Sequence, residues 1–266
     1  MGFTFLDHAG PLAMAHRGGS LEAPENSWLA LERAIDVLGY RYIETDVRLT
    51  ADGRVALLHD PTLDRTTDAV GPLAQANSAA LAETTLRGPN GKTSRGVPLL
   101  EDVLDRWPDV RFNLDAKDDA VVEPLAALLR HRKAIEAVCV GSFNEGRVRR
   151  MRKLLGPSLC TVSGVAETGR IRLASYGLPL PGKLAGACLE IPTGYKLVGP
   201  LGVPLIDRRL IEFAHRRGLA VIAWTIDDDA EMRRLLELGV DGIITDRPTV
   251  LADVLKAQGR WRGRQD

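Results

Sequence analysis

Carboxylate and histidine side chains are concentrated in the stretch IETDVRLTADGRVALLHD, residues 43–60. Glu44 and Asp46 are two residues apart near its start, and His59 lies near its end. Successive side chains of a β-strand point to opposite faces, so two acids with this spacing share one face. A turn at residues 51–53 would fold the chain back and bring His59 roughly opposite Asp46 or the residue before it. The stretch is therefore either a structural hairpin with polar residues at its open end, or half of an active site.

Two other apolar runs end in charged residues. LAMA is followed by His16 and Arg17, and FNLDAK carries Asp115 and Lys117 two residues apart. If these runs are neighbouring parallel strands of a closed barrel, their carboxyl ends gather at one end of that barrel. Two histidines, three carboxylates, one arginine and one lysine would then surround one site.

These residue types suit phosphodiester hydrolysis. Carboxylates that lie close together repel one another unless a cation sits between them. All-oxygen ligation favours a hard divalent ion, Mg²⁺ or Ca²⁺, over zinc. Arginine and lysine suit a phosphate group, and histidines suit a general base and a general acid because their pKa lies near neutrality.

The elements that must position these residues alternate between strand and helix. The chain has 266 residues, close to the ~250 typical of a (β/α)8 TIM barrel. We expect an α/β fold in one domain, residues 1–266, because no linker or change of composition divides the chain. The expected parallel strands are Leu12–Ala15, Tyr42–Asp46, Phe112–Ala116, Val138–Ser142, Leu159–Ser163, Ala187–Ile191, Ala220–Thr225 and Gly242–Thr245. The expected helices are Trp28–Leu38, Val121–His131, Asn144–Leu155, Arg208–Arg217, Asp229–Leu238 and Thr249–Ala257.

A further β-like run, Val55–His59, follows the second expected strand after only a few residues. A parallel crossover needs about a dozen residues, so this run must return antiparallel. We therefore expect a β-hairpin extension after the second strand. The segment between Asp60 and Leu99 leaves room only for a loop with one short helix.

Several motifs occur in an order that resembles the glycerophosphodiester phosphodiesterase family. They are HRGG, PENS, ETDVRLTADGRVALLHDPTLDRTT, LLEDVL, NLDAK, AWTIDD and GVDGIITDRP, between His16 and Pro248. The resemblance implies a barrel fold and metal-dependent hydrolysis of a glycerophosphodiester to an alcohol and glycerol 3-phosphate. It implies acid/base catalysis by His16 and His59, with one divalent cation, Mg²⁺ or Ca²⁺. The other implied site residues are metal ligands Glu44, Asp46 and Asp115, and substrate-binding residues Arg17, Lys117 and Trp224.

The sequence departs from the family pattern at Asp115, where glutamate is more frequent. Aspartate is one methylene shorter, so its carboxylate retreats by about 1.5 Å, one bond length. The ion could shift, a water could fill the gap, or the preferred metal could change.

Arg17 and Lys117 could also serve only as ion-pair partners of the carboxylates. Trp224 either packs in the core or forms a wall for the alcohol. Asp246 is expected to cap the following helix, with Pro248 in its first turn.

Two other functions are compatible with these motifs. A lysophospholipase D would use the same chemistry on lysophospholipids and would need an apolar surface near the strand ends. Apolar loop residues that could form one are Leu178, Leu180, Leu197, Val198 and Leu201, and Tyr195 could line the pocket mouth. A non-catalytic phosphodiester-binding protein belongs to a different functional class. The presence of both histidines and all three acids disfavours it.

Composition restricts the partners. The 35 basic and 35 acidic residues balance, so no basic surplus favours nucleic acid. No segment reads as a signal peptide or a stable membrane anchor, and three cysteines are too few for a disulfide framework. We expect Cys139, Cys160 and Cys188 to be buried apolar residues of a cytoplasmic protein. The sequence does not determine the oligomeric state.

Overall fold

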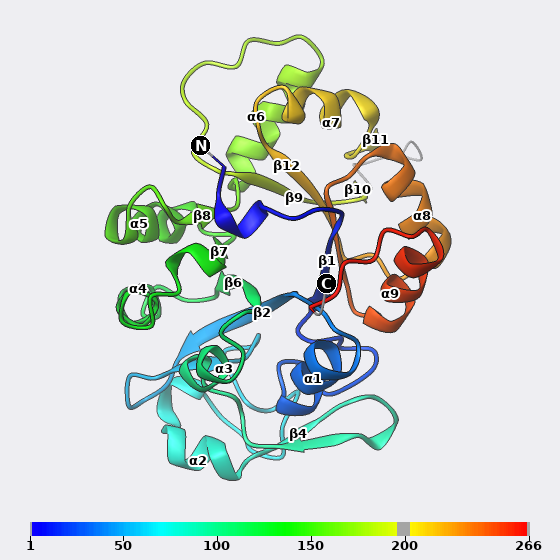
Figure 1. Ribbon diagram of the computed structural model, residues 1–266. Helices are drawn as coiled ribbons and strands as arrows, with labels where there is room; N and C mark the ends of the chain where they lie inside the picture. The colour runs from blue at the N-terminus through cyan, green and yellow to red at the C-terminus, as the bar shows by residue number, and fades with distance from the viewer. Residues whose placement is uncertain (1, 196–202, 265–266) are drawn as a thin grey trace.

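The computed structural model describes residues 2–195 and 203–264, and its centre is a barrel of parallel strands (Figure 1). The barrel strands are β1 (Leu12–His16), β2 (Tyr42–Leu49), β6 (Arg111–Ala116), β7 (Val138–Gly141), β8 (Cys160–Thr161), β9 (Cys188–Pro192), β12 (Ala220–Trp224) and β13 (Gly242–Thr245). Each pairs in parallel with its neighbours in the order β8-β7-β6-β2-β1-β13-β12-β9. An isolated parallel bridge between Val162 and Cys188 joins β8 to β9. The predicted (β/α)8 barrel is confirmed.

Helices surround the barrel on its outer side (Figure 1). They are α1 (Trp28–Glu32), α3 (Leu100–Arg106), α4 (Val122–His131), α5 (Glu145–Leu155), α6 (Val165–Ser175), α7 (Arg208–His215), α8 (Asp229–Leu238) and α9 (Pro248–Ala257). The sequence predicted neither α3 nor α6, and the apolar residues of α6 do not gather on one face. Two short strands, β10 (Gly194–Tyr195) and β11 (Val203–Pro204), pair antiparallel beside the barrel.

The start of α1 shows how local sequence fixes a helix end. Ser27 is the N-cap, and its Oγ accepts a hydrogen bond from the backbone N–H of Ala30 at 3.1 Å. Asn26 does not cap the helix, because its side chain bonds instead to residues of β2. After Glu32 the helix continues as a π-helical turn, Arg33–Val37, and it ends before Gly39.

Apolar residues fill both sides of the strands. On the outer side, strand residues such as Ile43 and Phe112 belong to one large core with the helices. Inside the barrel, Met14 and Tyr42 belong to a second cluster with Phe5 from the 3₁₀ turn η1 (Thr4–Leu6). Each fully buried large apolar side chain contributes about 1.5–3 kcal/mol to folding. Phe5 packs edge-on against Tyr42 at the start of β2, so it covers the amino end of the barrel and leaves the carboxyl end for the site.

The hairpin after β2 is confirmed. Strand β3 (Val55–Leu57) pairs antiparallel with β2, and Val47 lies opposite Leu57. The strand is two residues shorter than expected, but the backbone N–H of Leu58 still donates to the carbonyl of Asp46 at 3.1 Å. His59 therefore reaches the carboxyl end of β2, as the turn predicts.

The segment between β3 and α3 contains more structure than the expected loop with one helix. It holds the helix α2 (Ser78–Glu83), the antiparallel strands β4 (Thr85–Arg87) and β5 (Thr93–Arg95), and the 3₁₀ turns η3 (Leu73–Gln75) and η4 (Pro89–Gly91). It also has a small apolar core of its own: Ala56, Leu58, Leu63, Leu73, Leu81, Leu86 and Val97. Its two strands are three residues long, too short to show an alternating pattern. Across the whole described part of the chain, no helix is long and apolar enough to cross a membrane.

Candidate active site

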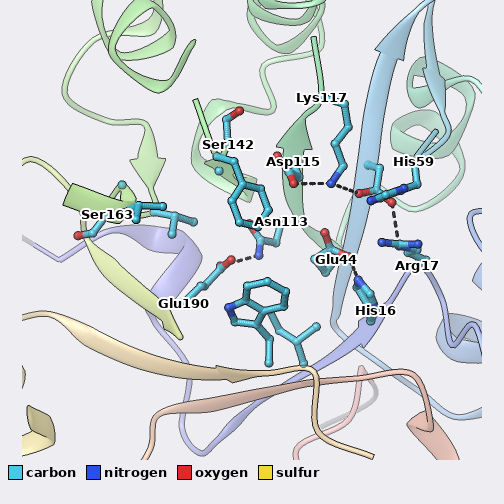
Figure 2. Close-up of a pocket in the computed structure, with 18 residues that line it drawn as sticks. His16, Arg17, Glu44, His59, Asn113, Asp115, Lys117, Ser142, Ser163 and Glu190 are labelled. Atoms are coloured by element: carbon cyan, nitrogen blue, oxygen red, sulfur yellow. Dashed lines mark hydrogen bonds and ion pairs between the residues drawn. The ribbon is translucent and has the colours of Figure 1, made fainter. Parts of the chain in front are cut away.

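The polar residues singled out in the sequence lie together in one pocket at the carboxyl ends of the barrel strands (Figure 2). The pocket has a volume of about 270 Å³. Its lining includes His16, Arg17, Glu44, Asp46, His59, Asp115, Lys117 and Trp224. The strand register explains the convergence, because His16 pairs with Glu44 and Asp46 pairs with Asp115 on neighbouring strands. The role of each residue stays a prediction.

The HRGG turn requires its glycines. Arg17, Gly18 and Gly19 all have positive φ, at 54°, 77° and 107°. A Cβ added to Gly18 would lie 2.8 Å from Ala30, and one added to Gly19 would lie 2.6 Å from Pro248. The turn therefore packs against α1 and α9 in a conformation that favours glycine, and it aims His16 and Arg17 into the pocket.

Asp46 is the most heavily paired acid of the site. Arg17 Nε lies 2.9 Å from its Oδ2, and Lys117 Nζ lies 2.9 Å from its Oδ1. Asn26 Nδ2 also donates to Oδ2 at 2.9 Å. Burial opposes ionisation of Asp46, but the charges of Arg17 and Lys117 outweigh it and hold its pKa below the usual value. Asp46 is therefore ionised although its side chain is fully buried.

Glu44 is in the opposite situation. Burial raises the pKa of its carboxyl to about 7, and the nearby His16 only partly offsets this. His16 Nε2 lies 3.5 Å from Glu44 Oε2. Negative charges on Asp46 and Asp115 raise the pKa further. A cation at this position would stabilise the carboxylate form of Glu44.

The three predicted metal ligands fit such a cation. Glu44 Oε2 and Asp115 Oδ1 are buried and have no hydrogen-bond partner among the described residues, and the third oxygen, Asp46 Oδ1, is buried beside Lys117. The Lys117 ammonium lies 2.7 Å from Asp115 Oδ2 and 2.9 Å from Asp46 Oδ1, so a positive charge already lies between two of the acids. Carboxylate oxygens are the ligands that Mg²⁺ and Ca²⁺ prefer.

His16 is held by a residue from the far end of the sequence. Its Nδ1 lies 2.6 Å from Asp246 Oδ1, which also accepts a hydrogen bond from Ser20 Oγ at 2.6 Å. Burial lowers the pKa of His16, but the negative charges of Glu44 and Asp246 outweigh it, so the pKa is raised. The prediction that Asp246 caps the following helix is wrong. The N-cap of α9 is Arg247, and the carboxylate of Asp246 is used to orient the imidazole instead. Pro248 does lie in the first turn, as expected.

His59 has a matching partner next to it in the sequence. Its Nδ1 lies 2.6 Å from Asp60 Oδ1, and Arg65 pairs with both Asp60 and Glu25. Glu25 also pairs with Arg17, which links the two sides of the pocket mouth. In both histidines the Nδ1 atom faces a carboxylate, which leaves Nε2 for other interactions.

The opposite side of the pocket carries few charges. Trp224, at the end of β12, packs edge-on against Phe143 with ring centroids 6.0 Å apart. Its indole Nε1 is buried and has no hydrogen-bond partner in the described part of the chain. Ser142 and Ser163 line the same side. Trp224 thus lines the pocket and also packs against the apolar cluster inside the barrel.

Sequence reasoning missed one hydrogen-bonded pair in the pocket, between the buried Asn113 and the half-buried Glu190. Asn113 Nδ2 donates to Glu190 Oε1 at 2.6 Å, and burial raises the pKa of Glu190 well above its usual value (Figure 2). A signal was available, because Glu190 interrupts the apolar run CLEIP on the inward face shared with Cys188. Of the expected apolar loop residues, Leu178 is exposed and Leu180 packs partly on the core. Leu197, Val198, Leu201 and the side chain of Tyr195 lie outside the described residues.

Comparisons with known proteins agree with the geometry. The glycerophosphoryl diester phosphodiesterase family matches residues 16–165 and 193–250. A Mycobacterium tuberculosis protein named probable glycerophosphodiester phosphodiesterase 2 is 37% identical over 97% of this chain and 96% of its own length. A mouse lysophospholipase D is 27% identical over 91% of this chain and 85% of its own length. The crystal structure of an Agrobacterium tumefaciens glycerophosphodiester phosphodiesterase, 26% identical, superposes with a TM-score of 0.73 over 91% of this chain and 99% of that one. The chain belongs to the glycerophosphoryl diester phosphodiesterase family.

Proposed function

We propose that this chain, acting as a single domain over residues 1–266, hydrolyses glycerophosphodiesters to an alcohol and glycerol 3-phosphate. One divalent cation, Mg²⁺ or Ca²⁺, would be held by Glu44, Asp46 and Asp115. His16 and His59 would be the acid/base pair. The observation that carries the proposal is the convergence of the three predicted ligands in a pocket that both histidines line, where Glu44 Oε2 and Asp115 Oδ1 are buried without a hydrogen-bond partner among the described residues.

The cation, when bound, would neutralise charge on the phosphate and polarise it for attack. Arg17 and Lys117 would orient the other phosphate oxygens through charge-assisted hydrogen bonds. Arg17 Nε lies 2.9 Å from Asp46 Oδ2, and Lys117 Nζ lies 2.7 Å from Asp115 Oδ2. They are therefore held in place before substrate binds, which lowers the entropic cost of positioning them.

The two histidines would divide the proton transfers. We assign His16 as the base that activates the nucleophile, either water or the neighbouring glycerol hydroxyl, because Glu44 and Asp246 make its imidazole more basic. We assign His59 as the acid that protonates the departing alkoxide. Its side chain is 35% exposed, against 15% for His16, so it lies nearer to where an alcohol would leave.

A lysophospholipase D activity is the second candidate, because two apolar side chains at the pocket are exposed. Phe143 and Val165 both line the pocket, and each is 66% exposed. Such residues could contact a lysophospholipid acyl chain. The free thiols of all three cysteines fit a reducing compartment, and we propose a cytoplasmic location.

One assay tests these alternatives together. Release of the alcohol is measured from glycerophosphocholine and from lysophosphatidylcholine, with Mg²⁺ or Ca²⁺ and after rigorous chelation. We expect turnover of glycerophosphocholine that chelation abolishes and either metal restores. Preference for lysophosphatidylcholine would favour the lipid-directed enzyme. Undiminished turnover without metal would contradict the metal site, and absence of turnover on every diester would favour a binding protein.

A further inference from the structure

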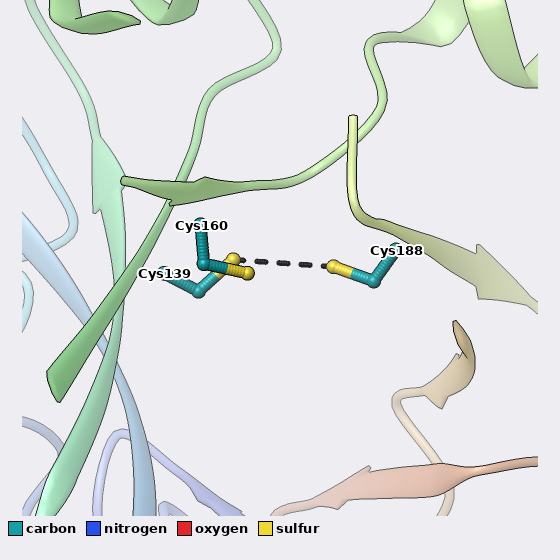
Figure 3. Close-up of side chains that lie close together, drawn as sticks. All are labelled: Cys139, Cys160 and Cys188. Atoms are coloured by element: carbon teal, nitrogen blue, oxygen red, sulfur yellow. Dashed lines mark hydrogen bonds between the residues drawn. The ribbon is translucent and has the colours of Figure 1, made fainter. Parts of the chain in front are cut away.

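All three cysteines of the chain lie close together in the apolar cluster inside the barrel (Figure 3). Cys139 lies on β7, Cys160 on β8 and Cys188 on β9, so three different strands contribute one sulfur each. The side chains are 0%, 1% and 0% exposed, and none is in a disulfide. Three small apolar residues would not need to be neighbours, whereas three ligands of one ion must be.

We propose that Cys139, Cys160 and Cys188 form a three-sulfur site for a soft, thiophilic metal ion, of which Cu⁺ is the physiological candidate. This site is separate from the hard-cation site of the pocket and does not depend on the proposed function. Thiolate sulfur selects soft ions such as Cu⁺, whereas carboxylates select Mg²⁺ and Ca²⁺. The two ligand sets in one barrel would therefore not compete for the same metal.

The spacing of the sulfur atoms supports the site. The three Sγ atoms lie within 4.8 Å of one another, and Cys139 Sγ lies 3.9 Å from Cys188 Sγ. Three sulfurs at a typical metal–sulfur distance of about 2.3 Å around a trigonal ion are separated by about 4.0 Å. The observed separation between Cys139 and Cys188 thus matches a shared ion. It is about twice the ~2.0 Å length of a disulfide bond.

The number of ligands narrows the choice of ion. No histidine or carboxylate of the described chain joins the three cysteines as a fourth ligand. Structural zinc is almost always bound by four ligands, so the site favours ions that accept three. The surrounding side chains are apolar, among them Met14, Ile222 and Ile244.

The location suggests what a bound ion would do. Strand β8 has two residues, and an isolated bridge joins it to β9. This makes the junction between β8 and β9 a weakly paired part of the barrel. An ion bound by Cys139, Cys160 and Cys188 would connect β7, β8 and β9 across that junction. We therefore expect metal binding to stabilise the fold rather than to supply chemistry.

The first experiment uses the full-length protein with Cu⁺ under anaerobic, reducing conditions, and with Cd²⁺ as a spectroscopic probe. Both are added to the folded protein and, in parallel, during refolding, because the sulfurs are buried. We expect one retained ion per chain, an ultraviolet sulfur-to-cadmium charge-transfer band, and a higher melting temperature. Zn²⁺ should bind more weakly. Binding only during refolding would still support the site, as one that is reached before the barrel closes.

Matched variants identify the ligands. Cys139→Ala and Cys188→Ala each delete one heavy atom, and each should abolish the charge-transfer band and the metal-dependent rise in melting temperature. Ile222→Val also deletes one heavy atom from the same apolar cluster, and it should keep both. If an alanine variant does not fold, thiol titration of the wild-type chain over a denaturant series decides, because the buried cysteines should become reactive at a higher denaturant concentration with Cu⁺ than without it. Lack of a stoichiometric ion in the wild type, or a mass showing loss of two hydrogens to a disulfide, would overturn the proposal.

Discussion

The two sides of the pocket differ in how their polar groups are paired. On the side built by β1, β2 and β6, acidic and basic side chains are in contact. Asp46, for example, contacts three polar side chains: Arg17, Lys117 and Asn26. On the side built by β7, β8, β9 and β12, aromatic and hydroxyl groups dominate, and the Trp224 indole N–H has no partner in the described structure. The first side suits a charged phosphate, and the second suits a neutral alcohol.

One glutamate on each side of the pocket makes the difference measurable. Glu44 has a pKa of about 7, lies near His16 and keeps one oxygen without a hydrogen bond among the described residues. Burial raises the pKa of Glu190 well above its usual value, which favours the neutral form, and Glu190 accepts a hydrogen bond from Asn113. The two glutamates therefore differ in their expected charge. A bound cation would stabilise the carboxylate form of Glu44, whereas burial and the nearby acidic groups favour the protonated form of Glu190.

The largest expected effect is that of Glu44→Gln. The amide keeps the shape of the side chain but removes one anionic ligand. A bound metal contributes several kcal/mol to the transition state, so we expect kcat/KM to fall roughly 10³- to 10⁴-fold. Isothermal titration should show weaker Mg²⁺ or Ca²⁺ binding in the variant.

The wild type supplies a pH control for this prediction. Below pH 7 the carboxyl of Glu44 is protonated in the metal-free protein and must lose its proton to bind a cation. Metal affinity should therefore fall as the pH drops below about 7, and Glu44→Gln should lose that part of the dependence. Unchanged metal affinity in the variant would remove Glu44 from the metal site.

The histidines come next. Removing a general acid or base typically costs about 10²- to 10⁴-fold in rate. His59→Ala should reduce kcat strongly on glycerophosphocholine but far less on a p-nitrophenyl diester, whose leaving group departs without a proton. His16→Ala should reduce kcat on both alike. Near-normal rates on glycerophosphocholine in either variant would contradict its assignment, and equal losses of the two variants on both substrates would point to a metal or structural role for one of them.

The Asp246 carboxylate tests how His16 is oriented. Asp246→Asn removes a negative charge that raises the pKa of His16, so the acidic limb of the pH–rate profile should move to lower pH. Loss of an orienting carboxylate typically costs about 10- to 100-fold in activity. Ser20→Ala is the control, because it removes the 2.6 Å hydrogen bond to Asp246 but leaves the charge in place. An unshifted limb in Asp246→Asn would show that His16 is not the group titrating there.

The sequence predicted the charged side of the pocket well, and the reason is local. Glu44 and Asp46, like Asp115 and Lys117, are two residues apart at strand ends, so the alternation of strand side chains suffices to put them on one face. The hairpin that delivers His59 follows in the same way from a connection too short for a crossover. The barrel itself follows from repeated apolar runs that alternate with helices.

What the sequence did not predict depends on contacts between distant residues. Asp246 is 230 residues from His16, and its position before a helix suggested a cap, although it serves the histidine instead. Asn113 and Glu190 are 77 residues apart. The three cysteines were correctly expected to be buried, yet their convergence depends on the closure of the barrel. No local pattern carries such contacts, because they are set by strand register around the whole barrel.

On the less charged side of the pocket, Trp224→Phe should have a modest effect. The ring stays, but the unpartnered buried N–H is lost. If that N–H donates to the substrate, its removal should cost about 0.5–1.5 kcal/mol, or roughly 2- to 10-fold in kcat/KM. The loss should be larger for glycerophosphocholine than for a p-nitrophenyl diester, and metal affinity should not change. A change in metal affinity would indicate that Trp224 contributes to the metal site.

The smallest expected effect is that of Glu190→Gln, the same substitution as in the first prediction. Burial raises the pKa of Glu190 and favours its protonated form, and an amide of the same shape keeps an oxygen as the acceptor for Asn113 Nδ2. We expect kcat/KM to stay within about threefold of the wild type, or roughly 0.6 kcal/mol. Glu190→Leu is the contrasting variant, because it leaves the buried Asn113 amide unpaired and should lower the free energy of unfolding by about 1–3 kcal/mol. Thermal or denaturant unfolding measures the stability loss of Glu190→Leu. Steady-state kinetics and metal titration measure the activity and metal affinity of Glu190→Gln. If Glu190→Gln instead lost activity and metal affinity as Glu44→Gln does, Glu190 would be an ionised member of the charged side, and the two sides would not be distinct.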